Sequence, residues 1–173
     1  MQSLMDVAAT VAARLRARGE TIAVGESSSG GLIAAALLAQ PGASAIFAGG
    51  AVVYNRTAMV ALAGFLPAEA QAVRSASEPY AGQLAARMRE RLGATWGLAE
   101  TGAAGPTGNR YGDAPGHSCC AVSGPLDRTQ TIETGSADRP ENMRSFALAA
   151  LVFMQAQLDL AGPPGPPPDD PPA

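Results

Sequence analysis

The stretch TIAVGESSSGGLIAAALL, residues 21–38, decides the fold class because a polar loop in it joins a strand pattern to a helix pattern. Residues 21–24 are short, apolar and rich in β-branched side chains, which is typical of a buried strand. Residues 32–38 favour a helix, and the turn residues Gln40-Pro41-Gly42 end it. We therefore predict a strand, a polar loop and a helix in succession, as in an α/β domain.

The same alternation continues on both sides of this unit. Ser3 and Asp6 form a capping-box pattern before an amphipathic helix that ends at Gly19. Further strands are predicted over 51–54, 95–99, 118–122 and 129–133, and further helices over 58–63, from Ser77 to Gly93 and from Asp138 to about residue 160. Residues 123–127 suit a hairpin connection. We expect one α/β domain over residues 1–160, with a mixed β-sheet flanked by helices.

Length and composition limit the functions of the chain. Its 173 residues suffice for one domain with a core, and the Pro-rich segment 161–173 is expected to be a disordered tail. A net charge of -3 with scattered arginines argues against nucleic acid as a partner. No stretch is long and apolar enough to span a bilayer, and the N-terminus lacks a basic region followed by an apolar core. We expect a soluble cytoplasmic protein without a membrane partner.

Several kinds of chemistry are excluded by residue type. All 12 basic side chains are arginine, so a lysine base, a Schiff-base lysine and a P-loop lysine are impossible. The two cysteines, Cys119 and Cys120, are neighbours on a predicted strand and should point to opposite faces as packing residues. The single histidine, His117, has no metal ligand at suitable spacing, so we predict no metal, no cofactor and metal-independent activity.

Two polar loops follow predicted strands: GESSSGG at 25–31 and ETGAAGPTG at 100–108. Ligands of α/β sheets bind at the carboxyl ends of strands, where helix N-termini offer free N–H groups to anions. We therefore predict a site for an anionic small molecule here. The structural alternative is that Ser28 or Ser29 caps the helix while Glu26 interacts with its positive end. Neither loop has the dinucleotide-binding or P-loop pattern.

Six segments of the chain match a known set of motifs in the same order. They are residues 25–31 (similar to A-E-S-C-T-G-G), 40–47 (x-x-G-S-S-A-x-F), 53–55 (T-Y-S-N), 76–79 (A-V-S-E-x), 101–106 (T-G-I-A-G-P), and Arg139 with Arg144, which open the last helix. Over about residues 5–160 the chain thus resembles the CinA C-terminal domain family, the nicotinamide-nucleotide amidohydrolases also called competence/damage-inducible proteins.

This resemblance implies an α/β fold, a homodimer as a common assembly, and a small-molecule nucleotide as the partner. The implied hydrolase activity belongs to pyridine nucleotide salvage: the carboxamide of nicotinamide mononucleotide gives nicotinate mononucleotide and ammonia. Ser27 corresponds to the presumed nucleophile, and Tyr54 to a second catalytic residue. The glycine-rich loop would hold a phosphate or an oxyanion. The substrate-binding positions implied are Glu26, Ser28, Ser29, Gly30, Gly31, Thr101, Gly102, Gly105 and Arg144.

The chain departs from the family pattern where a proton acceptor is needed. Met59 stands where the family has the lysine that would activate the serine, and Gly49 and Asp113 replace two family cations. Substitute bases by residue type are Glu26 and His117. Phosphate contacts could come from Arg56 or Arg110, and stacking from Trp96 or Tyr111, although Trp96 also suits a core position. Two interpretations stay open: an amidohydrolase with an altered base, or a catalytically degenerate member that acts as a nucleotide-binding or interaction module.

Overall fold

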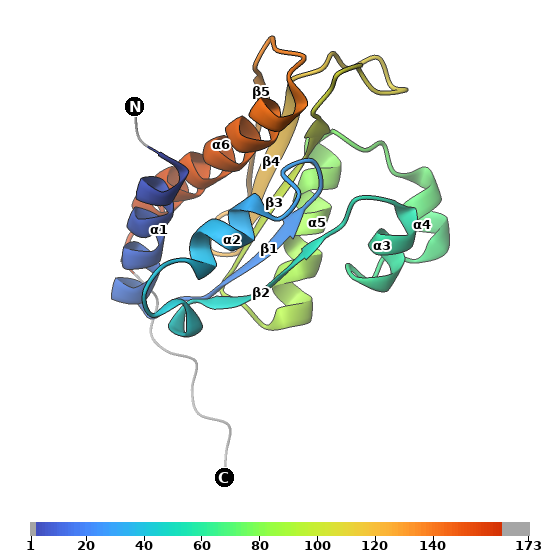
Figure 1. Ribbon diagram of the computed structural model, residues 1–173. Helices are drawn as coiled ribbons and strands as arrows, with labels where there is room; N and C mark the ends of the chain where they lie inside the picture. Colours follow the sequence, from blue (N-terminus) through green and yellow to red (C-terminus); the bar gives the residue numbers. More distant parts are fainter. Residues whose placement is uncertain (1–2, 164–173) are drawn as a thin grey trace.

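The computed structural model describes residues 3–163 and has a five-stranded mixed sheet between two layers of helices (Figure 1). The strands are β1 (Ile22–Glu26), β2 (Phe47–Val52), β3 (Trp96–Ala103), β4 (His117–Ser123) and β5 (Arg128–Glu133). The helices are α1 (Leu4–Arg18), α2 (Leu32–Leu38), α3 (Arg56–Ala61), α4 (Pro67–Ala72), α5 (Glu78–Leu92) and α6 (Arg139–Leu160), with a 3-10 turn at Ala43–Ala45. The predicted α/β fold with a mixed sheet is confirmed. The predicted tail falls largely on residues 164–173, which lie outside the described residues.

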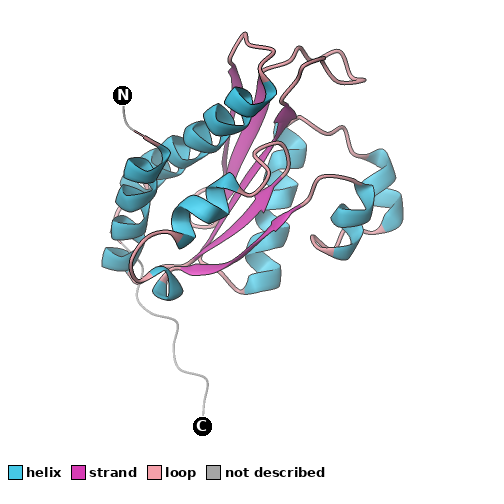
Figure 2. Cartoon of the chain, in the orientation of Figure 1, coloured by secondary structure: helices cyan, strands magenta, loops and turns pink. Residues whose placement is uncertain are grey.

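The strand order is β2-β1-β3-β4-β5, and β3 joins two kinds of pairing. β1 pairs in parallel with β2 and with β3, whereas β3–β4 and β4–β5 are antiparallel. The predicted hairpin over 123–127 connects β4 to β5. Since parallel neighbours end at the same edge, the connections that follow β1, β2 and β3 gather at one end of the sheet (Figure 2).

Each face of the sheet has its own apolar core. One cluster packs α1, α2 and α6 on the sheet and includes Trp96 and Cys120; the other packs α3, α4 and α5 and includes Met59 and Cys119. The predicted opposite orientation of the two cysteines is therefore confirmed. Trp96 is fully buried and donates its indole N–H to Glu20 Oε2 at 2.7 Å, so it is a core residue and not a stacking platform.

Side-chain caps fix the predicted helix starts. Ser3 Oγ accepts the amide of Asp6 at 3.2 Å, and the Asp6 carboxylate accepts the amide of Ser3 at 3.0 Å, which completes the capping box of α1. Asp138 caps α6 by accepting the amide of Glu141 at 3.0 Å. Within residues 3–163, no helix has both the length and the apolar character needed to cross a bilayer.

Two predicted strands have incorrect bounds, and one helix was not predicted. β2 covers Phe47–Val52 and not 51–54, because Gly49 and Gly50 weaken the strand pattern while pairing with β1 fixes the strand in space. β3 continues through Glu100 to Ala103, which had been predicted as loop, because β4 pairs with it along its full length. The short helix α4 was not predicted; Pro67 at its first position is its only clear sequence signal.

Candidate functional site

The carboxylate of Glu26 stabilises the loop after β1. This side chain accepts the amides of Gly31 and Ile33 at 3.0 Å and of Ala34 at 2.8 Å, so it caps α2 from the preceding strand. Gly30 and Gly31 have φ values of 66° and 99°, which lets the chain turn back over this carboxylate. Glu26 is buried and its oxygens accept amides at the start of α2, as the structural alternative predicts. The predicted serine cap is wrong: Gly31 is the N-cap of α2, the Ser29 hydroxyl contacts two carboxylates, and Ser28 Oγ bonds no group within residues 3–163.

Glu100 supports the same loop from the neighbouring strand β3. Its Oε2 accepts the amide of Ser29 at 2.8 Å and the amide of Ser27 at 3.3 Å, and Ser118 Oγ lies 3.0 Å from Oε1. Burial raises the pKa of Glu100, and the hydrogen bonds from Ser29, Ser118 and Ser27 only partly oppose that rise. Sequence reasoning missed Glu100 because its inward orientation depends on β3 continuing past residue 99.

One of the three serines of the loop after β1, Ser28, lines a cavity at the strand ends. This cavity has a volume of about 220 Å³ and is lined by Ser28, Tyr54, Gly102, Ala103, Ala104, Gly105, Thr107, Gly108, Asn109 and Arg139. Ser28 Oγ is buried and has no hydrogen-bond partner within residues 3–163, whereas most buried hydroxyls have one. An unpaired hydroxyl in the wall of a polar cavity can serve a ligand as a hydrogen-bonding group or as a nucleophile once a side-chain rotation exposes it.

Arg139 connects two walls of this cavity. Its Nη1 donates to the carbonyl of Gly105 at 2.8 Å, and its Nη2 donates to the hydroxyl of Tyr54 at 3.2 Å. Tyr54 is 60% exposed, so its ring forms the rim of the cavity. Arg139 lies on α6 near its N-terminus, and its guanidinium supplies the positive charge that an anionic ligand would meet.

The structure brings together some of the predicted site residues and separates others. Ser28, Tyr54, Gly102 and Gly105 line the cavity, while Ser27 is half-buried beside it and does not line it. The Thr101 side chain lies on the face of β3 opposite to that of Glu100, and there its hydroxyl accepts the amide of Ala76 at 3.2 Å. The Ser29 hydroxyl lies within hydrogen-bond distance of the carboxylates of Glu26 and Glu100. A Cβ atom added to Gly30 would contact Met143 on α6.

The arginine at the cavity is Arg139 and not Arg144. The side chain of Arg144 is 65% exposed and lies 3.5 Å from Glu141, one turn earlier on α6. The sequence pattern points equally to both arginines, and only their positions around the axis of α6 show which of them lines the cavity. A residue at the N-terminus of a helix faces the strand ends, and this relation could have favoured Arg139 beforehand.

The position of the family lysine lies inside the apolar core. Met59 is 4% exposed and packs in the cluster below α3, α4 and α5. The cavity lining contains no carboxylate and no imidazole. A proton acceptor for a serine would therefore have to be Tyr54, water or the substrate itself, since methionine binds no proton.

His117 is engaged away from the cavity. Its Nε2 lies 3.0 Å from the carbonyl of Ala76, and its Nδ1 pairs with the carboxylate of Glu133. Burial alone would lower the pKa of His117, but the hydrogen bonds to Glu133 and Ala76 outweigh it and raise this pKa. Both ring nitrogens face acceptors, so the imidazolium form is favoured and His117 serves the structure as a bridge.

The other proposed cation and stacking residues also lie outside the cavity. Arg110 donates to the hydroxyl of Tyr111 at 2.9 Å, and Tyr111 donates to the carbonyl of Val73 at 3.3 Å. Arg56 reaches the carbonyl of Gln71 at 3.5 Å. Within residues 3–163, no three His, Cys, Asp or Glu side chains are grouped so that they could hold a metal ion.

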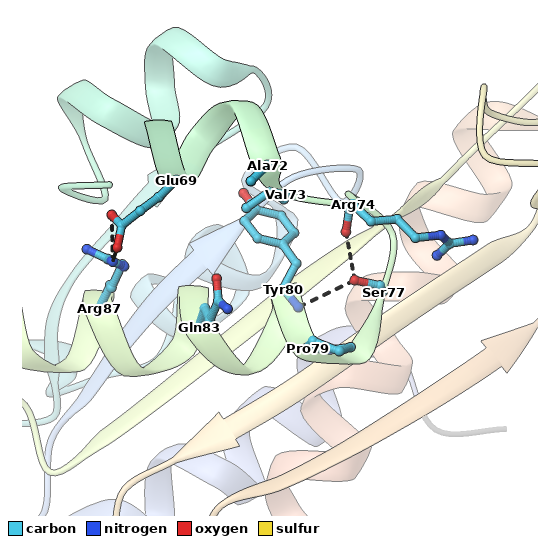
Figure 3. A pocket seen from close by; sticks show the side chains of 9 residues that line it. All are labelled: Glu69, Ala72, Val73, Arg74, Ser77, Pro79, Tyr80, Gln83 and Arg87. Atoms are coloured by element: carbon cyan, nitrogen blue, oxygen red, sulfur yellow. Dashed lines mark hydrogen bonds and ion pairs between the residues drawn. The ribbon is translucent and has the colours of Figure 1, made fainter. Parts of the chain in front are cut away.

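A larger hollow of about 780 Å³ lies between α4 and α5 (Figure 3). The polar groups at its rim pair with each other: Arg87 donates to both oxygens of Glu69 at 2.9 Å, and Ser77 donates to the carbonyl of Arg74 at 2.7 Å. The hydroxyl of Tyr80 is buried and has no hydrogen-bond partner within residues 3–163, as is also true of Ser28 Oγ. We place the candidate site at the smaller cavity because four of the predicted site residues line it together with Arg139: Ser28, Tyr54, Gly102 and Gly105.

The sheet order, the two helix layers and the polar loops at the strand ends define a class of single-domain α/β proteins. A CinA superfamily protein from Klebsiella pneumoniae has this fold, with a TM-score of 0.85 and 24% identity over 92% of this chain and 99% of that one. A competence/damage inducible protein from Agrobacterium tumefaciens gives a TM-score of 0.83 and 25% identity over 92% of this chain and 97% of that one.

Sequence comparison narrows this class to one family. The family model described as the CinA C-terminal domain matches residues 4–158, and the chain belongs to this family. The CinA-like proteins of Anaeromyxobacter sp. (strain K) and Myxococcus xanthus (strain DK1622) are both 41% identical, over 86% and 90% of this chain. The chain spans only 36% and 37% of the length of these two relatives.

Proposed function

We propose that the protein hydrolyses the carboxamide of nicotinamide mononucleotide at the cavity between Tyr54 and the glycine-rich loop, releasing ammonia and nicotinate mononucleotide. The observation that carries this proposal is that Ser28, whose buried hydroxyl has no hydrogen-bond partner within residues 3–163, lines the same cavity as Tyr54 and Arg139. Arg139 would bind the anionic part of the nucleotide.

The reaction needs a hydroxyl that attacks the carbonyl carbon and a group that receives the hydroxyl proton. Attack by Ser28 would form an acyl-enzyme, and the departing nitrogen would take up the proton and leave as ammonia. Water would then release the carboxylate product and restore the hydroxyl. We assign Tyr54 to relay the proton between these groups, and the backbone N–H groups of the glycine-rich loop to stabilise the oxyanion.

A second candidate function is nucleotide binding without turnover. It is favoured by the apolar surroundings of Met59 and by the absence of a carboxylate or imidazole from the cavity lining. Loss of a positioned general base costs about 100-fold to 10,000-fold in rate, so a binding module of this kind could retain the cavity and lose the chemistry.

Ammonia release from nicotinamide mononucleotide tests both functions in one set of variants. Wild type is compared with Ser28→Ala, Ser27→Ala and Arg144→Ala, and ligand-induced shifts of the melting temperature are recorded on the same samples. We expect turnover that Ser28→Ala abolishes and Arg144→Ala retains. Loss in Ser27→Ala alone would assign the nucleophile to Ser27, as the family resemblance implies. A thermal shift without turnover would support the binding module, and neither signal would contradict both functions.

A further inference from the structure

Glu100 is a fully buried carboxyl group without a cation. Its residue has 0% exposure, and none of the ion pairs formed among residues 3–163 includes it. Isolated ionised carboxylates are very costly to bury, so such a group normally pairs with a cation, binds several donors or keeps its proton. The hydrogen bonds around Glu100 distinguish these cases.

Ser29 links Glu100 to a second buried carboxyl. Its Oγ lies 2.8 Å from Glu100 Oε2 and 2.7 Å from Glu26 Oε2, both within hydrogen-bond distance. A hydroxyl carries one hydrogen, so it cannot donate fully to two ionised carboxylates at once. Two negative charges on either side of one small hydroxyl would also repel each other, which favours one proton on the pair.

The proton belongs on Glu100 because Glu26 is better stabilised as an anion. Glu26 accepts three amides at the N-terminus of α2, where the helix dipole favours negative charge. A protonated Glu100 has a hydrogen-bond acceptor nearby for its proton. Its Oε1 can donate to Ser118 Oγ at 3.0 Å, and that hydroxyl can donate onward to the carbonyl of Thr101 at 3.5 Å. Oε2 then remains the acceptor for the amides of Ser27 and Ser29.

We propose that Glu100 keeps its proton in the folded protein at neutral pH and, in this form, positions residues 27–29 so that Ser28 lies in the wall of the cavity. Glu100 is a positioning residue, since it touches the loop and does not line the cavity. The inference rests on the proposed function only in treating this cavity as the ligand site. The protonation of Glu100 can be measured in the protein without any ligand.

The other ionisable groups around Glu100 leave this assignment unchanged. Cys120 pairs with it across β3 and β4, and burial is the main cause that raises the pKa of this thiol to about 12, so it stays neutral. α2 has no ionisable side chain, and α6 directs Arg139 to Gly105 and Tyr54. Tyr80 on α5 is neutral, because burial raises the pKa of its hydroxyl.

The first experiment is the pH dependence of unfolding for wild type and Glu100→Gln, with Glu78→Gln as the matched control. Glutamine resembles the protonated acid, since its NH₂ can donate to Ser118 while its oxygen accepts the loop amides. From about pH 5 to pH 7, the unfolding constant of wild type relative to Glu100→Gln should rise about tenfold per pH unit, up to the folded pKa of Glu100. A ratio that stays constant over this range would overturn the proposal.

The control should behave in the opposite way. Glu78 accepts the hydroxyls of Thr129 and Thr131 at 2.6 and 2.7 Å, and these hydrogen bonds lower its pKa. The contribution of Glu78 to the free energy of unfolding is therefore present at neutral pH and is lost only in acid. A loss of stability between about pH 5 and pH 6.5 that wild type and Glu78→Gln share, and that Glu100→Gln lacks, assigns the titration to Glu100, because the contribution of His117 is still complete in that range.

The positioning role is tested by hydrogen exchange at the amides of Ser27 and Ser29. Glu100→Gln should keep their protection and any melting shift caused by nicotinamide mononucleotide, whereas Glu100→Ala should lose both. Equal protection in the two variants would contradict the role. Should Glu100→Gln fail to fold, an infrared carbonyl band of a protonated acid in wild type at pH 7 supports the proposal, and its absence overturns it. Absence of nicotinamide mononucleotide turnover with the pH profile intact would contradict only the proposed function.

Discussion

Arg139 donates a hydrogen bond to the hydroxyl of Tyr54 at 3.2 Å, although 85 residues separate them in the chain. The same guanidinium donates to the carbonyl of Gly105, so one side chain of α6 joins the connection after β2 to the loop after β3. The cavity of the candidate site therefore depends on a contact between elements that lie far apart in sequence.

Replacing Arg139 should weaken ligand binding more than it weakens the fold. Hydrogen bonds to charged groups contribute about 1.5–3 kcal/mol, so Arg139→Ala should raise the Kd for nicotinamide mononucleotide on the order of 10- to 100-fold. Arg139→Lys keeps the charge but lacks the planar fork, and it should restore only part of the affinity. Isothermal titration measures both. Arg144→Ala is the control, and an equal loss in that variant would place the anion site elsewhere.

His117 should make the protein less stable as the pH rises. Its folded pKa is raised above the ordinary value of 6.5, so its contribution to stability is complete below that value and disappears as the pH passes the folded pKa. Because it is the single histidine, one imidazole resonance in a proton NMR titration reports this pKa directly. His117→Gln should remove the corresponding part of the pH dependence of unfolding. A measured pKa at or below 6.5 would contradict the bridge to Glu133 and Ala76.

Glu26 should be needed for stability at the start of α2. In Glu26→Gln one oxygen becomes an NH₂ group, which cannot accept an amide such as that of Ala34, and a buried unsatisfied donor costs about 1–3 kcal/mol. We expect a loss of this size in the free energy of unfolding from denaturant titration. Glu141→Gln, at an exposed position of α6, should change it by less than about 0.5 kcal/mol. Similar values for the two variants would argue against the cap.

Alanine substitutions at two glycines should change the stability of the protein in opposite directions. A Cβ on Gly97 would collide with the backbone carbonyl of Ala85, whereas a Cβ on Gly82 would meet no atom within 4 Å. Gly97→Ala should therefore destabilise the packing of β3 on α5 by about 1–3 kcal/mol. Gly82→Ala lies inside α5 and should stabilise the protein by about 0.5–1 kcal/mol, since alanine favours helix. Thermal or denaturant unfolding distinguishes the signs, and a neutral Gly97→Ala would show that the strand can move away.

The sequence was sufficient to predict the fold class, and local signals explain why. Ser3 with Asp6, Ser77 and Asp138 each cap a helix where their residue types suggest it, and the hairpin at 123–127 joins adjacent strands. The predicted bounds of β2 were wrong because Gly49 and Gly50 have low strand propensity, and this strand forms through its pairing with β1. Local pattern predicts elements that local interactions determine.

The site was predicted less completely, since it depends on register and on rotation about helix axes. The two polar loops were predicted, but the serine that lines the cavity was not, because Ser27, Ser28 and Ser29 are alike in sequence. Glu100 was assigned to a loop and so was not expected to point inward. Arg139 and Arg144 are also alike until their positions on α6 are known.

The pairing of β1 with β3 also has a consequence for the order of folding. β4 and β5 are joined by a short connection, whereas Ser29 and Glu100 meet only after 71 residues of chain have been closed into a parallel pair. Contacts between distant residues form slowly because the entropy of loop closure must be overcome first. We therefore expect the antiparallel half to gain amide protection early in refolding and the candidate site to be among the last parts to assemble.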